Sequence, residues 1–158
     1  MMKETLVAVC AVLNKHDVKY LVIGGVAVIY HGYTRATSDI DFWYKPSLDN
    51  FHNILDAFKE YGVDVSDLES ITFDPKTTYL RLPTGFRTEF LPAVGSDVLF
   101  DDAKEKSETL ELEGVKIPVI GYDHLVHLKM TTNRLKDKAD VEELHKRHQS
   151  GRNKNSGF

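Results

Sequence analysis

Two short apolar segments, one ending in paired glycines and the other carrying paired aspartates, constrain the fold of this chain most strongly. Residues 20–23 read YLVI and run directly into Gly24-Gly25, a pattern typical of a buried strand that enters a tight turn. Residues 38–44 read SDIDFWY, and their apolar side chains predict a second strand inside a sheet. Because residues i and i+2 of a strand project from one face, Asp39 and Asp41 are expected to direct two carboxylates to one point.

The remaining pattern predicts helices and hairpins around these two strands. Amphipathic spacing favours helices near the N-terminus, after the potential cap Ser47, and at 123–134 and 137–148. Hairpins are expected around the PTG turn at 83–85 and around Glu113-Gly114. This order of elements predicts one domain over residues 1–148, of the mixed α+β class, with a mixed central sheet flanked by helices. Residues 149–158 are polar and glycine-rich, and we expect them to form a disordered tail.

Charge and cysteine content exclude several classes of protein. The chain has 158 residues and a formal net charge of −4, which argues against a general binder of polyanions. The single cysteine rules out an intrachain disulfide framework and fits a reducing compartment. No run of residues approaches the ~20 apolar residues of a membrane span, and the N-terminus lacks the layout of a signal peptide. We therefore expect a cytoplasmic protein without a membrane partner.

The paired aspartates suggest a site for a divalent cation. Two carboxylates held close together repel each other, and one of them is driven toward its neutral form unless a cation lies between them. Magnesium accepts such hard oxygen ligands and completes its octahedron with waters and phosphate oxygens. The glycine turn just upstream, followed by a helix, would let backbone N–H groups approach those phosphates. The alternative, that Asp39 and Asp41 lie on the solvent face of an edge strand, is weakened by the apolar residues around them.

A larger set of residues between Gly24 and Asp41 resembles, in type and order, the signature of the DNA polymerase β-like nucleotidyltransferase superfamily. The resemblance is closest to the bacterial AbiEii-like branch, and the small antibiotic nucleotidyltransferases are similar too. A weaker resemblance continues through Lys129, Arg134, Lys136-Asp137 and Asp140. The main signature consists of Gly24-Gly25, Ala27, His31-Gly32, Arg35, Thr37 and Asp39-x-Asp41.

The resemblance implies the nucleotidyltransferase fold, two magnesium ions and the transfer of a nucleoside monophosphate from a nucleoside triphosphate. The metal-binding and catalytic carboxylates would be Asp39, Asp41 and, as the third, Glu89. Glutamate at this position departs from the commoner aspartate, and an ordinary exposed strand glutamate is the alternative. The residues expected to bind the nucleotide are Gly24, Gly25, Arg35, Thr37 and Lys129.

Some of these residues have plainer alternatives. Gly25 stands where many superfamily members carry a phosphate-binding serine, so its backbone N–H would have to replace that hydroxyl. Arg35 is either a phosphate ligand or a surface arginine, and Lys129 is either a phosphate ligand or a solvated lysine. The charges of KDKADVEELHKR are interpreted mostly as a solvated helix face.

The acceptor of the nucleotide and the oligomeric state are not specified by the sequence. The first hypothesis is a protein or RNA acceptor in a toxin–antitoxin or phage-defence setting. The second is a small-molecule acceptor such as an antibiotic. A third is a module that binds a nucleotide or a protein on the same fold without turnover, since fold alone does not establish activity.

Overall fold

A mixed β-sheet forms the centre of the protein. The computed structural model describes residues 1–132 and 134–149, and within them a six-stranded sheet has the order β3-β4-β2-β1-β6-β5. The pairs β2–β4 and β1–β6 are parallel, and the other three pairs are antiparallel. The strands are β1 (Tyr20–Ile23), β2 (Asp39–Tyr44), β3 (Leu80–Pro83), β4 (Arg87–Leu91), β5 (Glu108–Leu112) and β6 (Val115–Val119).

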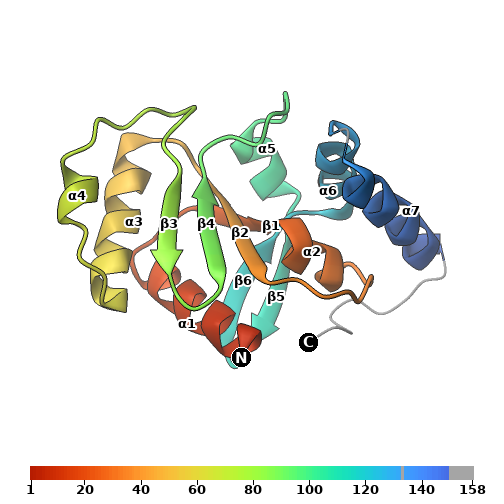
Figure 1. The fold of residues 1–158 in the computed structure, drawn as a ribbon, viewed down its shortest axis with the longest axis horizontal. Coiled ribbons are helices and arrows are strands. Elements are labelled where there is room, and N and C mark those ends of the chain that lie inside the picture. Colours follow the sequence, from red (N-terminus) through yellow and green to blue (C-terminus); the bar gives the residue numbers. More distant parts are fainter. Residues whose placement is uncertain (133, 150–158) are drawn as a thin grey trace.

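Helices cover this sheet from both ends. Figure 1 shows α3 and α4 beside β3 at one end, and α6 and α7 at the other. None of the described helices is long and apolar enough to cross a bilayer. The helices are α1 (Met2–Lys15), α2 (Gly24–Tyr30), α3 (Leu48–Tyr61), α4 (Ser66–Glu69), α5 (Phe100–Glu105), α6 (Tyr122–Met130) and α7 (Leu135–Gln149).

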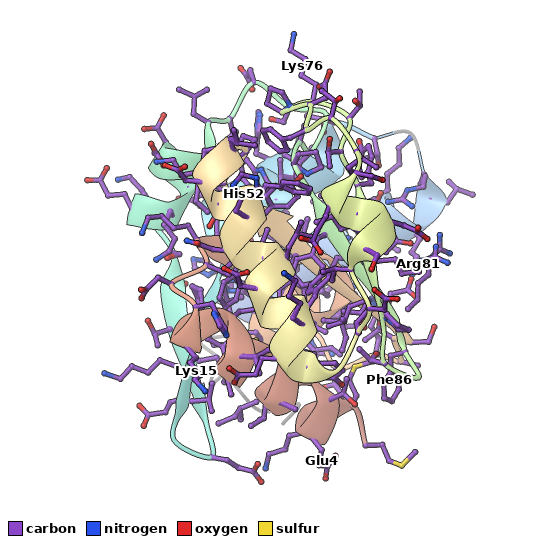
Figure 2. The ribbon with its side chains drawn as sticks, turned by 90° about the vertical axis from the view of Figure 1, so that its left-hand side faces the viewer. Glu4, Lys15, His52, Lys76, Arg81 and Phe86 are labelled. Atoms are coloured by element: carbon purple, nitrogen blue, oxygen red, sulfur yellow. The ribbon has the colours of Figure 1, made fainter. Side chains whose placement is uncertain are left out.

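Alternation along β2 and β4 separates an apolar face of the sheet from a polar one. Phe42 stacks on Phe90 with ring centroids 4.7 Å apart, and Phe58 of α3 meets Phe90 edge-on at 5.1 Å. The side chains of alternate residues therefore face α3, which lies in front of the sheet with α1 in the view of Figure 2. Because neighbouring residues point the opposite way, Asp39 and Asp41 face away from α3 and α1.

The predicted mixed sheet flanked by helices is confirmed. Both hairpins form, as β3–β4 and β5–β6. The short helices α4 and α5 were not expected, because four and six residues are too few to show a helical period. The helix expected at 123–134 ends at Met130. Of the predicted tail, Gln149 is the last residue of α7, and residues 150–158 lie outside the described ones.

Asn50 joins the ends of the two strands that carry the glycine turn and the aspartates. It is buried in the first turn of α3, where its Oδ1 accepts from the N–H of Lys19 at 2.8 Å. Its Nδ2 donates to the carbonyl oxygens of Lys19 and Lys45, at 2.9 and 3.0 Å. One side chain thus satisfies three backbone groups beside the start of β1 and the end of β2, which keeps these strands in register.

Replacing Asn50 by Ala should lower the free energy of unfolding by about 1–3 kcal/mol, because three hydrogen bonds are lost and the N–H of Lys19 loses its partner. The measurement is urea unfolding followed by circular dichroism. His52, which is exposed two residues further along α3, provides the matched control: His52→Ala should change the stability by less than about 0.5 kcal/mol. Equal effects of the two substitutions would contradict the role given to Asn50.

Candidate active site

The parallel pairing of β2 with β4 brings three carboxylates to one face of the sheet. Asp41 is the register partner of Glu89, and Asp39 is the partner of Arg87. Residues in register on neighbouring parallel strands project from the same face. Glu89 therefore lies on the polar face with Asp39 and Asp41, and all three line one cleft of about 390 Å³.

Gly24 lies at the floor of this cleft, directly against the carboxylate of Asp41. It has a φ of +66°, and a Cβ placed on it would lie 2.5 Å from Oδ2 of Asp41. Any side chain here would therefore be strained and would also collide with the aspartate. Gly25 has a similar steric role on the other side of the turn, where a Cβ would lie 2.6 Å from Oγ1 of Thr37.

The steric contact at Gly25 explains the absence of serine at this position. The space that a serine Cβ would need is already filled by the side chain of Thr37. Thr37 also accepts a hydrogen bond from the backbone N–H of Asp39, which places it at the entry to β2. Thr37 can therefore hold the backbone of Asp39 in this way only while position 25 is a glycine.

The carboxylates repel one another, and the effect is strongest at Asp41. Burial, and after it the charges of Asp39 and Glu89, together raise the pKa of Asp41 to about 6, against the opposing effect of Lys129 and Arg87. A shift of this size corresponds to about 3 kcal/mol of differential interaction. The chemistry of this donor set fits a divalent cation, because hard oxygen ligands would then bind a charge that relieves their repulsion.

Glu89 is held by arginines rather than turned fully toward the aspartates. It accepts a hydrogen bond from Nε of Arg87 and another, at 3.0 Å, from Nη2 of Arg81. The hydrogen bond from Arg87 is the main reason that the pKa of Glu89 is lowered. Accordingly, no group of three or more His, Cys, Asp or Glu residues within 1–132 and 134–149 is drawn together tightly enough to hold a metal ion.

A buried ionic network forms the opposite wall, between α6 and α7. Nζ of Lys129 lies 3.1 Å from Asp137 and 3.2 Å from Asp140. Arg35 donates two hydrogen bonds to Asp140, at 3.0 and 3.1 Å. Burial alone would raise the pKa of Asp137, but hydrogen bonds from Thr132 and Lys129 leave it lowered. The network therefore fixes α7 against both α6 and the loop before β2.

This network corrects two interpretations drawn from the sequence. Lys129 is 9% exposed, so it is not a solvated lysine, and Asp137 and Asp140 are buried rather than part of a solvated face. Helical periodicity did not distinguish them because α7 has few apolar residues to mark its inner side. The signal that could have identified them is the pair of aspartates three residues apart, which must share a face of the helix.

The predicted site residues divide into two groups in space. The cleft is lined by Gly24, Asp39, Asp41, Glu89 and Lys129. Gly25, Arg35 and Thr37 do not line it: Gly25 lies against the side chains of Thr37 and Arg35, and the guanidinium group of Arg35 is paired with Asp140. The sequence analysis did not single out Tyr79, Arg87, Leu91, Val94 and Thr132, which also line the cleft, and it named Arg134 without a role.

Known proteins resemble the chain in sequence and in fold. A model of the aminoglycoside-2''-adenylyltransferase family matches residues 5–144. No curated protein sequence matches significantly. A solved structure described as a candidate nucleotidyltransferase from Thermotoga maritima has a TM-score of 0.56 at 17% identity, covering 94% of this chain and 92% of that one.

Two further solved structures are antibiotic-modifying proteins. The lincosamide antibiotic adenylyltransferase LnuA, bound to lincomycin, has a TM-score of 0.55 at 14% identity and covers 84% of this chain and 89% of its own. ANT(2'')-Ia, in complex with adenylyl-2''-tobramycin, has a TM-score of 0.56 at 12% identity, with 94% and 95% covered. At these identities the structures establish a shared fold, and the family model adds the sequence relationship.

The raised pKa of Asp41 gives a prediction for the metal-free protein. Between pH 4 and 6 the folded state binds more protons at Asp41 than the unfolded state does, so the unfolding free energy falls as the pH rises through this range. Asp41→Asn removes this loss of unfolding free energy, because the amide stays neutral at every pH in the range. The variant should match the parent at pH 4 and exceed it by about 1–3 kcal/mol at pH 7. Urea unfolding in chelator across this range measures the difference, and a variant less stable at pH 7 would contradict the raised pKa of Asp41.

The buried network gives a second prediction. Asp140→Asn should lower the unfolding free energy by about 3 kcal/mol, because Arg35 loses its carboxylate partner and Lys129 keeps only one. The control is Glu142→Gln on the same helix, whose ion pair with Lys146 is exposed and whose loss should cost less than about 1 kcal/mol. Thermal unfolding of both variants checks the contrast, and similar melting temperatures would contradict it.

Proposed function

The chain belongs to the aminoglycoside-2''-adenylyltransferase family, and from this premise we propose that it transfers a nucleoside monophosphate from a nucleoside triphosphate to a hydroxyl of a small molecule. The observation that carries the proposal is the cleft that Asp39, Asp41 and Glu89 line from one face of the sheet, with Gly24 and Lys129 as further lining residues. The small-molecule acceptor, an alternative in the sequence analysis, is preferred because the similar proteins include antibiotic adenylyltransferases.

Asp39 and Asp41 are the proposed ligands of magnesium, and Glu89 is the proposed third ligand. When bound, magnesium would neutralise phosphate charge and lower the pKa of the attacking hydroxyl. Glu89 has to release at least one arginine to take part. Its lowered pKa makes it a weak general base, so a role as a ligand suits it better than proton abstraction.

The triphosphate is proposed to lie between the aspartates and Lys129. Gly24 lets the backbone approach phosphate oxygens without a side chain intervening. Asp137 and Asp140 hold the ammonium group of Lys129 at the cleft wall, so little side-chain entropy would be lost when it meets the phosphates. Arg35 and Thr37 are then proposed to act indirectly, Arg35 through Asp140 and Thr37 through the backbone of Asp39.

The setting proposed from the AbiEii-like resemblance is less well supported. The matching family model is that of aminoglycoside adenylyltransferases, and nothing in the cleft bears on a toxin–antitoxin or phage-defence role. A nucleotide-binding module without turnover is favoured by one observation, the capture of Glu89 by Arg81 and Arg87. Turnover of labelled triphosphate distinguishes this binding module from an enzyme.

Asp39→Asn together with Asp41→Asn should abolish both metal-dependent nucleotide binding and transfer, because the amides lack the charge that binds the cation. With magnesium and ATP at about one hundred times the dissociation constant, the parent should gain roughly 2.7 kcal/mol of stability. The double variant should gain none. Thermal unfolding measures binding, and incubation with labelled ATP and a metabolite extract measures transfer.

The matched control replaces two acids outside the cleft. Asp101 and Asp102 lie side by side on α5 and are exposed, so Asp101→Asn with Asp102→Asn should leave binding and transfer as in the parent. Labelling of the same acceptor by the Asp39 and Asp41 variant would refute the catalytic role of these carboxylates. A parent protein that binds the nucleotide but never labels an acceptor would support the non-catalytic reading.

A further inference from the structure

The side of the cleft formed by β3 and β4 is the side left for the acceptor. In the sheet order β3-β4-β2-β1, the glycine turn follows β1, whereas Glu89 lies on β4. Lys129 and Gly24 therefore mark the phosphate side of the aspartates, and the cleft continues past Glu89 toward β3. An acceptor hydroxyl that attacks the nucleotide must approach from this second side, because the triphosphate fills the first.

The charges on this second side are positive in excess. Arg87 lines the cleft, and Arg81 lies beside it as the register partner of Glu89 on β3. The two arginines share the single carboxylate of Glu89, and their side chains are 60% and 64% exposed. Arg134 is another exposed guanidinium group of the cleft, but it belongs to the opposite wall, where it lies 2.9 Å from Asp137. Figure 2 shows Arg81 at the margin of the molecule, on the edge strand β3.

The acidic residues of the cleft are already committed. Among the described lining residues the acids are Asp39, Asp41, Glu89 and Asp137. Asp137 is buried and bonded to Lys129, Thr132 and Arg134, and the aspartates of β2 belong to the phosphate side. No further carboxylate among these lining residues remains to receive an ammonium group of an acceptor. A polyamine would thus meet guanidinium groups, which repel it.

Apolar side chains complete the same side. Leu80 pairs with Phe90, so continuing the antiparallel register by one residue sets Tyr79 beside Leu91, and both line the cleft. Tyr79 is 58% exposed. An exposed aromatic ring beside a leucine offers a surface on which a ring of a ligand can pack.

We propose that the acceptor is an acidic hydroxyl compound, with a carboxylate or phosphate bound by Arg81 and Arg87 and a ring packed on Tyr79 and Leu91. This inference rests on the proposed nucleotidyl transfer and names its substrate class. It separates the chain from ANT(2'')-Ia, which was solved in complex with adenylyl-2''-tobramycin, because tobramycin carries several amino groups. A guanidinium group pairs with a carboxylate or a phosphate in a charge-assisted, often bidentate geometry.

The test compares three probes that share a phenyl ring and a hydroxyl group but differ in charge. These are 3-phenyllactate, its methyl ester and phenylalaninol, with tobramycin as the polycation. Dissociation constants are measured by NMR titration of the whole chain, with and without magnesium and a non-hydrolysable ATP analogue. Phenyllactate should bind at least about tenfold more tightly than phenylalaninol, with the ester between them and tobramycin no tighter than phenylalaninol.

The variant Arg81→Gln, Arg87→Gln should reduce this preference to threefold or less, or reverse it, because Glu89 then remains without its cations. The control is Lys15→Gln, which breaks an exposed lysine–glutamate pair between α1 and α3 and should keep the full preference. If the double variant fails to fold, Arg81→Gln alone should reduce the preference at least twofold.

Three results would overturn the acidic acceptor. They are tighter binding of tobramycin or phenylalaninol than of phenyllactate, no binding of phenyllactate at all, and a preference that survives loss of the arginines. Titration with the ATP analogue alone tests the nucleotidyltransferase proposal independently of the acceptor. Its failure counts against the nucleotidyltransferase proposal, whereas nucleotide binding combined with a preference for cations counts against the acidic acceptor alone.

Discussion

Repulsion between carboxylates that the sheet forces together is the constraint on which the site depends. The parallel pairing of β2 with β4 sets Asp41 beside Glu89, and strand alternation sets it on the side of Asp39. A protein without a use for this arrangement would gain stability by losing it, because burial and like charges raise the pKa of Asp41 to about 6. Gly24, which packs directly on Asp41, shows that the surrounding backbone accommodates the carboxylate closely.

The surrounding charges balance this repulsion from two directions. On β3 and β4, Arg81 and Arg87 bind Glu89. On α6 and α7, Lys129 faces the cleft while Asp137 and Asp140 anchor it. Cations on both sides can thus keep a site of concentrated negative charge folded before any metal or nucleotide is bound. The same residues define the proposed phosphate side and the proposed acceptor side of the cleft.

Family membership and local chemistry agree about the reaction and differ about the acceptor. The match to aminoglycoside adenylyltransferases supports nucleotidyl transfer, and the polar face of the sheet carries residues suited to it. Selectivity for an acceptor depends instead on side chains at the rim, and solved structures with 12–17% identity establish the shared fold alone. The rim residues Tyr79, Arg81 and Arg87 are therefore more informative about substrate than the family name.

Elements with a local signal could be predicted from the amino-acid sequence. The glycine turn, the Asp39-x-Asp41 strand, both hairpins and the mixed sheet were all predictable, because strand alternation and turn chemistry depend on adjacent residues. Which distant side chains meet depends on the tertiary structure. In the folded protein Arg35 pairs with Asp140, Lys129 pairs with Asp137, and Glu89 pairs with two arginines. Such pairings depend on how α7 packs against the rest of the fold and on strand register, and a long-range ionic contact leaves no periodic mark in the chain.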